Sequence, residues 1–408
     1  MTLAEGDRLE LTVGPVAHGG HCVARHEGLV VFVRHALPGE RVEAEVTEVR
    51  RAYLRADAVA VLDPAPDRVP PPCPYARPDA CGGCDLQHVA PAAQLQWKTD
   101  VLHEQLHRLA GLSPAEVSEL SVRVEPLPGG LLGWRSRMRY AVDAAGRAGL
   151  LKHRSHEVVP VDRCLIAHPA IQELPVLTSS DRRWPDADAV EVVASSVGDL
   201  AVRGVSGGAT TTAEGAEQVR EAAVGRQWTL PAEAFWQVHP LAADTLAAAV
   251  LDLLRPLPGE SAWDLYGGAG LFAAALAARV GPSGRVTLVE AAPSSQQAAR
   301  ENLADLTQVE VVAARVETAL SRRRIAGPVD LVVLDPPRTG AGVEVVRSLA
   351  GCRARAIAYV ACDPAAFARD VRAFRVAGWQ LAAVRAYDLF PMTQHFECVG
   401  LLVPASVG

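Results

Sequence analysis

The sequence predicts an α/β protein in which a doubly wound, mostly parallel sheet follows a small β-barrel and a central α+β segment. From about residue 226, strand-like segments alternate with Ala-rich helical stretches, the pattern of a Rossmann-like sheet. The strand-like segments are 261–266, 285–290, 329–334, 355–361, 379–385 and 396–403. Residues 1–62 alternate apolar and charged positions around turn glycines and Pro38-Gly39, as the short strands of an OB-like barrel do. The Pro-rich stretch 63–72 marks a boundary, so we expect three domains: 1–62, 63–225 and 226–408.

Composition narrows the class of protein. A hydrophobic fraction of 49% and a charged fraction of 21% over 408 residues are typical of a globular protein. The net charge of −7 argues against a simple polycationic nucleic-acid binder, although clustered arginines can still bind phosphate. No apolar run reaches the ~18–20 residues of a membrane helix, and the start MTLAEGDRLELTV is unlike a signal peptide. We therefore expect a cytoplasmic protein without membrane contact, and a monomer without an obligate protein partner.

A cysteine cluster lies at the start of the central segment. Cys73, Cys81 and Cys84 follow the spacing C-x7-C-x2-C, and Cys164 could supply a fourth ligand from a distant segment. Zinc and a [4Fe-4S] cluster both take four such ligands. Because zinc ribbons usually present two C-x2-C pairs and only one is present, an iron–sulfur cluster is favoured. The remaining cysteines outside the chemical motifs, Cys22, Cys352 and Cys398, are expected to be plain buried residues.

The rest of the central segment contains one amphipathic helix and a basic pair of strands. Leu95, Leu102, Leu106 and Leu109 share one face of a helix that ends near Gly111. In the following strand, 134–142, three arginines alternate with apolar residues, and a turn at 144–146 leads into a second basic strand. A solvated charged face and a phosphate-contacting surface explain these arginines about equally well. They are Arg135, Arg137 and Arg139, with Lys152 and Arg154 on the second strand.

The first chemical motif of the C-terminal domain is WDLYGGAGLF, residues 263–272. A strand ends in Asp264, and a glycine-rich turn leads into a helix, where backbone amides can approach a ligand. Gly268 and Gly270 lack the third glycine of the dinucleotide fingerprint. Glu290 closes the next strand, where an acid can accept hydrogen bonds from a ribose diol. A surface acid after a buried strand is the alternative for Glu290 alone.

Two further motifs follow predicted strands. LVVLDPPRTG delivers Asp335 to the carboxyl edge of the sheet, where open α/β sheets bind ligands. AYVACDPAAFARD places Cys362 at the end of a strand, with Asp363 as a helix N-cap and Pro364 at the first helical position. The helix dipole there favours a thiolate, so we favour a nucleophile over an inert buried cysteine.

The last motif is DLFPMTQHFECVGLL, in which Glu397 opens the final strand. A carboxylate flanked by apolar residues is partly desolvated, which suits a proton acceptor. Asp388, His395 and Glu397 are all candidates by chemistry, and their spacing does not choose among them.

Taken together, these motifs resemble the uracil-C5 RNA methyltransferases that use S-adenosylmethionine. Residues 1–62 resemble a TRAM domain, an RNA-binding barrel, through GHCVARHEGLVVFVRHALPGERV. The cysteine region is similar to the [4Fe-4S] site of the ribosomal-RNA members. FWQVHP at 235–240, DLYGGAG, LVVLDPPRTG, YVACDPAAFARD and FPMTQHFE resemble the family's blocks in their order.

The resemblance implies a reaction and a set of residues. Methyl transfer to C5 of a uridine in RNA is implied, with ribosomal RNA favoured over tRNA. The implied nucleophile is Cys362, which adds to C6 of the base, and Glu397 is the base that removes the C5 proton. The residues that line the S-adenosylmethionine site are Gln237, Tyr266, Glu290 and Asp335. The implied ligands of one [4Fe-4S] cluster are Cys73, Cys81, Cys84 and Cys164.

The sequence departs from the family pattern at several positions. His239 and Asp363 stand where asparagine is common, and Gly267 replaces a usual cysteine. Arg315 lies near the place of the acid expected to contact adenine.

Two other functions fit parts of the sequence. A non-catalytic RNA-binding protein with a methyltransferase fold is disfavoured because Cys362 and Glu397 are both present. A radical enzyme needs a compact C-x3-C-x2-C motif, which the sequence lacks.

Overall fold

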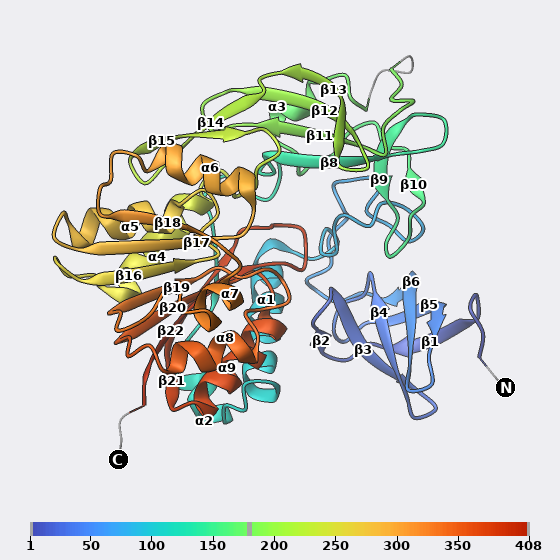
Figure 1. Ribbon diagram of the computed structural model, residues 1–408. Helices are drawn as coiled ribbons and strands as arrows, with labels where there is room; N and C mark the ends of the chain where they lie inside the picture. The colour runs from blue at the N-terminus through green and yellow to red at the C-terminus, as the bar shows by residue number, and fades with distance from the viewer. Residues whose placement is uncertain (1–2, 178–181, 406–408) are drawn as a thin grey trace.

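The structure is a computed structural model that describes residues 3–177 and 182–405. Its N-terminal part is a six-stranded barrel-like sheet, drawn in blue in Figure 1, with the order β1-β5-β6-β4-β3-β2. Alternate residues of these strands form one apolar interior, which includes Leu11, Val31, Val42 and Leu54. The strands are β1 (Arg8–Thr12), β2 (Val16–Ala17), β3 (His21–His26), β4 (Leu29–Arg34), β5 (Arg41–Val49) and β6 (Tyr53–Asp63).

A second sheet of six strands, shown in green in Figure 1, has the order β10-β9-β8-β11-β12-β13. A short helix, α3 (Pro169–Gln172), precedes β11, and a separate hairpin joins β14 (Gln218–Ala223) to β15 (Arg226–Pro231). The strands of the sheet are β8 (Arg137–Val142), β9 (Ala148–Leu151), β10 (Val158–Val159), β11 (Ala189–Ala194), β12 (Leu200–Ser206) and β13 (Ala209–Gly215).

The third sheet has eight strands in the order β18-β17-β16-β19-β20-β22-β21-β7. It confirms the predicted α/β class, because β16 to β20 pair in parallel and only β22 runs antiparallel to its neighbours. The strand order reverses on either side of β16, which creates the switch point where such sheets bind ligands. The strands are β16 (Ser261–Leu265), β17 (Arg285–Glu290), β18 (Val309–Ala313), β19 (Leu331–Leu334), β20 (Ala356–Ala361), β21 (Trp379–Asp388), β22 (Glu397–Pro404) and β7 (Val124–Pro126).

Helices cover both faces of this sheet. One buried cluster contains residues of α4 (Ala242–Leu254), α5 (Leu271–Val280) and α6 (Pro293–Asn302). The other contains residues of α7 (Val316–Ser321), α8 (Val343–Ala350), α9 (Pro364–Val376), α1 (Pro91–Arg108) and α2 (Pro114–Glu119). Among the described residues, no helix has the length and apolar character required to cross a membrane.

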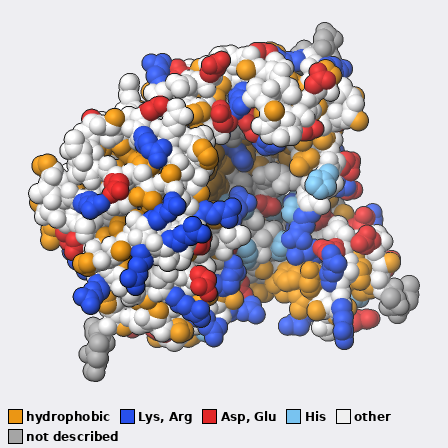
Figure 2. Space-filling model, viewed as in Figure 1, with side chains coloured by type: hydrophobic (Ala, Val, Ile, Leu, Met, Phe, Trp, Pro, Cys, Tyr) orange, Lys and Arg blue, Asp and Glu red, His pale blue; other side chains and the backbone are white. Residues whose placement is uncertain are grey.

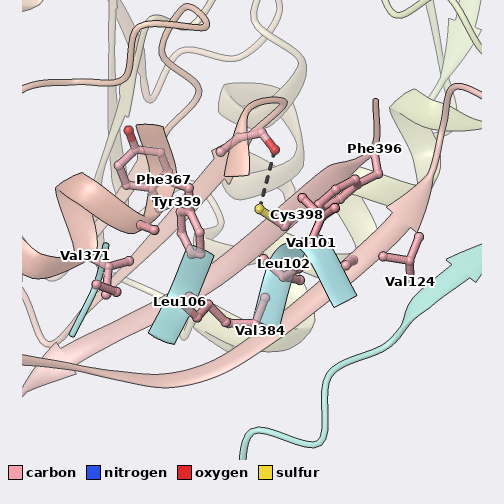
Figure 3. Packing of buried hydrophobic residues seen from close by; sticks show 14 of the residues in the cluster. Val101, Leu102, Leu106, Val124, Tyr359, Phe367, Val371, Val384, Phe396 and Cys398 are labelled. Carbon is pink, nitrogen blue, oxygen red and sulfur yellow. Dashed lines mark hydrogen bonds between the residues drawn. The ribbon is translucent and has the colours of Figure 1, made fainter. Parts of the chain in front are cut away.

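Helix α1 belongs to the packing of the third sheet, although it lies far from it in sequence. Figure 3 shows Leu102 and Leu106 of α1 close to Tyr359 of β20 and Phe367 of α9, and both leucines are fully buried. Cys398 is also fully buried there, with its Sγ 3.5 Å from the carbonyl oxygen of Ala361. Together with β7, α1 thus ties residues 91–126 to the C-terminal sheet. The domain boundaries at residues 62 and 225 remain predictions from the sequence.

Candidate active site

The carboxyl edge of the third sheet gathers most of the predicted site residues. Asp335 follows β19, Cys362 follows β20, and Glu290 ends β17. Glu397 begins β22, which runs antiparallel, so its first residue lies at the same edge. The register pairs Ala361 with Cys398, and this pairing places Cys362 and Glu397 beside each other at the ends of two bonded strands.

The glycine turn after β16 is bound to Glu290. One carboxylate oxygen of Glu290 accepts the N–H of Gly268 at 2.9 Å. The other oxygen accepts the N–H groups of Ala291 and Ala292 at 2.7 and 2.6 Å. Glu290 is therefore no free surface acid, because it holds the loops after two neighbouring strands together. A Cβ atom at Gly267 would lie 2.5 Å from the side chain of Leu288, so the glycine lets this turn pack closely against β17.

Asp264 is a site residue that the sequence interpretation did not select. It is fully buried in β16, and its Oδ2 accepts the N–H of Ala273 at 2.8 Å. Its Oδ1 is buried without a hydrogen-bond partner. Burial, together with the charges of Asp335 and Glu290, raises the pKa of Asp264 to about 7. An acid inside an otherwise apolar strand was the available signal.

Tyr266 and Gln237 lie on loops near this edge. Tyr266 follows β16 with a φ of 62°, and its hydroxyl donates to Glu317 of α7 at 3.3 Å. Gln237 is half-buried in the segment between β15 and α4. The neighbouring Val238 carbonyl accepts the N–H and the hydroxyl of Ser136 at 2.8 and 2.9 Å, which ties this segment to the start of β8.

The surroundings of Cys362 disfavour a thiolate. Burial, and then the charges of Glu397, Asp335 and Asp363, raise the pKa of Cys362 to about 12, and Arg338 opposes them. The expectation that the helix N-terminus favours a thiolate here is therefore wrong for the protein alone. The residue does lie directly before the N-cap of α9, and the acidic surroundings outweigh that position.

The other two acids of this edge are also shifted. Burial raises the pKa of Asp335 to about 7. Burial, together with the charge of Asp335, raises the pKa of Glu397 well above its usual value, and Arg338 lowers it in part. The positive charge of Arg338 acts on both Cys362 and Glu397. Arg338, which the sequence interpretation did not select, supplies the positive charge of this edge.

The structure distinguishes the three candidates for a base in the last motif. Asp388 is buried in an ion pair with Lys98, whose Nζ lies 2.6 Å from its carboxylate. Burial, and then the charge of Arg338, lower the pKa of His395 to about 4. Glu397 is the candidate that lies beside Cys362, so the geometry favours it.

The four clustered cysteines come together from two segments. Cys73, Cys81, Cys84 and Cys164 line one small cavity, partly open to solvent, together with Arg135. Burial raises the pKa of Cys81 to about 11 and that of Cys84 and Cys164 above the usual value. Within residues 3–177 and 182–405, no group of three or more His, Cys, Asp or Glu side chains is arranged to hold a metal ion.

The predicted basic strand is only partly available to a ligand. Arg137 is mostly buried, pairs with Glu221 at 3.1 Å and donates to two backbone carbonyls. Arg139 is exposed and pairs with Glu191. The three arginines therefore do not form one open phosphate-binding face, because Arg137 is used inside the protein and Arg135 turns to the cysteine cavity.

Comparisons with known proteins agree with this architecture. Residues 3–59 match the TRAM domain, and residues 231–405 match the tRNA (Uracil-5-)-methyltransferase family. An uncharacterized RNA methyltransferase of Streptomyces avermitilis is 47% identical over 99% of this chain and 100% of its own length. One from Corynebacterium glutamicum is 35% identical over 99% of this chain and 98% of its own length.

A solved structure shares the fold. The Pyrococcus abyssi tRNA (uracil-54, C5)-methyltransferase in complex with S-adenosyl-L-homocysteine has a TM-score of 0.71 and 21% identity. The match covers 97% of this chain and 100% of that chain.

Proposed function

This chain belongs to the uracil-C5 RNA methyltransferase family and is an S-adenosylmethionine-dependent enzyme, and from that premise we propose a covalent mechanism at Cys362 and Glu397. The observation that supports the proposal is the pairing of Ala361 with Cys398, which brings Cys362 and Glu397 to the ends of two bonded strands. The proposed substrate is a uridine in ribosomal RNA, and we propose that the enzyme acts in the cytoplasm.

The mechanism follows from the electronic structure of uracil. C5 is a poor nucleophile until the thiolate of Cys362 adds to C6 and turns the ring into an enolate. C5 then forms a bond to the methyl group, and the sulfonium bond to that methyl breaks. Glu397 takes the C5 proton, and the electron pair of that C–H bond re-forms the double bond as the Cys362 sulfur leaves C6.

The charges of the site define what this chemistry requires. Burial and mutual repulsion disfavour the charged forms of Cys362 and Glu397 in the protein alone and raise the pKa of both groups. Both must ionise to act, so positive charge has to be added near them. Arg338 opposes the rise in both pKa values, and the proposed role of its guanidinium is to stabilise the thiolate and the enolate.

The residues around the glycine turn suit the cofactor. S-adenosylmethionine supplies the methyl group, and its sulfonium cation favours ionisation of nearby acids. Glu290 is proposed to accept one ribose hydroxyl with the lone pair that its three backbone partners leave free. The close approach of Gly267 and the unpartnered Oδ1 of Asp264 show a backbone cradle with a buried polar atom beneath it. Gln237, Tyr266 and Asp335 complete the proposed cofactor site.

We further propose that Cys73, Cys81, Cys84 and Cys164 hold one [4Fe-4S] cluster. The support is that all four cysteines line one cavity and that Arg135 lines it too, where it would offset the negative charge of thiolates. Methyl transfer by the route above moves no single electron. The proposed role of the cluster is therefore structural: it joins the loop 73–84 to Cys164 next to β8.

The RNA target divides into two candidates. Ribosomal RNA is proposed because the cysteine region resembles that of the ribosomal-RNA members, and tRNA is the second candidate because the structural neighbour is named for tRNA. Figure 2 shows a hollow between the parts of the molecule with Lys and Arg side chains around it, which suits an RNA backbone.

Two experiments test this function. Cys362→Ala should lose methyl transfer from labelled S-adenosylmethionine to total RNA, whereas Cys352→Ala, which alters a buried cysteine elsewhere, should retain it. Turnover by Cys362→Ala would refute the role of Cys362 as the nucleophile. Mapping 5-methyluridine in ribosomal RNA and tRNA from a deletion strain then identifies the target, because the modification disappears from one position.

A further inference from the structure

Positive charge is concentrated on one layer of helices in this acidic protein. Residues 311–380 contain eleven arginines and six acids, a net charge of +5, whereas the whole chain has −7. Helices α7, α8 and α9 of this stretch lie side by side on one face of the third sheet. Figure 2 shows Lys and Arg side chains over these helices, next to the hollow between the parts of the molecule. An anionic partner is therefore attracted to this layer, although the protein as a whole is acidic.

Four exposed arginines of this layer are not used inside the protein. Arg322 and Arg323 follow α7, and Arg369 and Arg372 belong to α9. With the residues that the structure describes, the side chains of these four make no hydrogen bond and no ion pair. Many exposed arginines elsewhere are bound to carboxylates, so these four are unusual in being open to a partner. Examples of the paired kind are Arg8, Arg41 and Arg220.

The acids of the three helices do not neutralise these arginines. Glu317 of α7 accepts the hydroxyl of Tyr266, and Glu344 of α8 lies 3.5 Å from Arg347 on its own helix. The acid of α9, Asp370, is buried and binds the hydroxyl of Tyr359 at 2.6 Å. The positive charge of the layer is therefore available at its surface.

The layer begins at the proposed active site. Helix α9 starts directly after Cys362 and its N-cap Asp363, and Arg369 and Arg372 lie one turn apart on the exposed side of this helix. Arg372 is nine residues into α9, which places it about 14 Å along the helix axis from the start. The two arginines thus lead away from the point at which the target base is proposed to react.

We propose that the arginine face, formed by Arg322, Arg323, Arg369 and Arg372, binds the sugar–phosphate backbone of the RNA outside the target uridine. A guanidinium group binds the two oxygens of a phosphate with parallel hydrogen bonds, and such contacts fix the position of a nucleic acid without reading its sequence. The inference rests on the proposed RNA substrate, and it adds a contact surface on the methyltransferase sheet itself.

The experiment measures the binding of the full chain to two fluorescein-labelled unmodified transcripts, one of ribosomal RNA and one of tRNA, from 50 to 300 mM KCl. The variants are Arg369→Gln/Arg372→Gln and Arg322→Gln/Arg323→Gln. Each should bind at least one transcript roughly tenfold more weakly at 100 mM KCl. The slope of log Kd against log salt concentration should fall by about 1.4–1.8, because each lost phosphate contact removes about 0.7–0.9.

The matched control removes the same charge from the opposite face of the sheet. Arg279 of α5 and Arg300 of α6 are exposed as well, and their helices belong to the other buried cluster. Arg279→Gln/Arg300→Gln should bind both transcripts as the wild type does. Binding of S-adenosylmethionine, measured by calorimetry, should stay unchanged in all three variants, which verifies that they are folded.

Three results would overturn the proposal. One is wild-type RNA binding by both variants of the arginine face, and another is an equal loss in the control, since net charge alone would then be the cause. The third is unchanged RNA binding together with lost binding of poly-glutamate, which would assign the face to an acidic protein. In each case the wild type still binds and methylates RNA; a wild type that does neither would contradict the proposed function instead.

Discussion

The carboxylate of Asp85 accepts the main-chain N–H of Gln394 at 3.1 Å, and this bond joins the residue after Cys84 to the segment before Glu397. Two backbone bonds run alongside it, since the N–H groups of Asp85 and Leu86 both donate to the carbonyl of Met392, at 3.1 and 3.0 Å. The cysteine loop is therefore fastened to the loop that carries the proposed base. A change that disturbs the cysteine loop should therefore displace the loop that carries the proposed base.

This link predicts a catalytic role for a residue outside the active site. Asp85→Ala removes the acceptor for Gln394, so kcat should fall roughly tenfold, as a loss of about 1.4 kcal/mol in positioning gives. The KM for S-adenosylmethionine should stay near its original value. Asp85→Asn keeps an acceptor oxygen and should recover most of the rate. Asp79→Ala, an exposed acid of the same loop, is the control, and an equal loss there would refute the link.

The cysteine cavity predicts a metal content and a binding effect. Protein purified without oxygen should be brown and contain about four irons and four sulfides per chain. Cys164→Ser should weaken RNA binding by about tenfold, which is ~1.4 kcal/mol, and leave S-adenosylmethionine binding near wild type, because Cys164 lies next to β8 and not at the sheet edge. One zinc without sulfide would contradict the cluster.

A stability prediction concerns Lys98 and Asp388. Lys98 is fully buried, and burial lowers its pKa while the ion pair with Asp388 opposes that change. Lys98→Met leaves Asp388 buried without its partner and should cost about 3–5 kcal/mol of the free energy of unfolding, measured with urea. The double variant Lys98→Met/Asp388→Leu should regain part of this. An equal loss of unfolding free energy in the single and the double variant would show that the unpaired charge of Asp388 is not the cause.

Glu397→Gln tests the proposed base. The amide cannot take the C5 proton, so methylated RNA should stay attached to the enzyme, and multiple turnover should fall by about 10²–10⁴-fold. Denaturing gels should show the bound RNA, and a His395→Gln variant should not accumulate it. Prompt release of methylated RNA by Glu397→Gln would assign proton removal to another group.

Much of the C-terminal fold could be predicted from the sequence because its strands and helices follow local patterns of apolar and polar residues. The strands predicted at 261–266, 285–290, 329–334, 355–361, 379–385 and 396–403 match β16, β17, β19, β20, β21 and β22 closely. Strand β18 was not predicted, because it lies at the edge of the sheet, where Val309–Ala313 is only partly buried. The pairing of β7 with β21 could not be read either, because it joins segments far apart in the chain.

For the site, only the types of the residues and their positions at strand ends could be predicted from the sequence. Cys362, Asp335 and Glu290 follow strands, and the expectation that they share one edge agrees with the structure. The ionisation of Cys362 could not be inferred from its helix position, because the opposing acids arrive from other strands. The use of Arg137 by Glu221 and the pairing of Asp388 with Lys98 likewise depend on contacts across long stretches of chain.

The most direct test of the covalent mechanism uses RNA in which the target uridine is replaced by 5-fluorouridine. Fluorine at C5 cannot leave as a proton does, so the adduct between Cys362 and C6 cannot resolve. The wild-type enzyme with S-adenosylmethionine should give a complex that survives denaturation, and its cross-linked peptide should contain Cys362. Absence of that complex, or the same complex in Cys362→Ala, would contradict the mechanism.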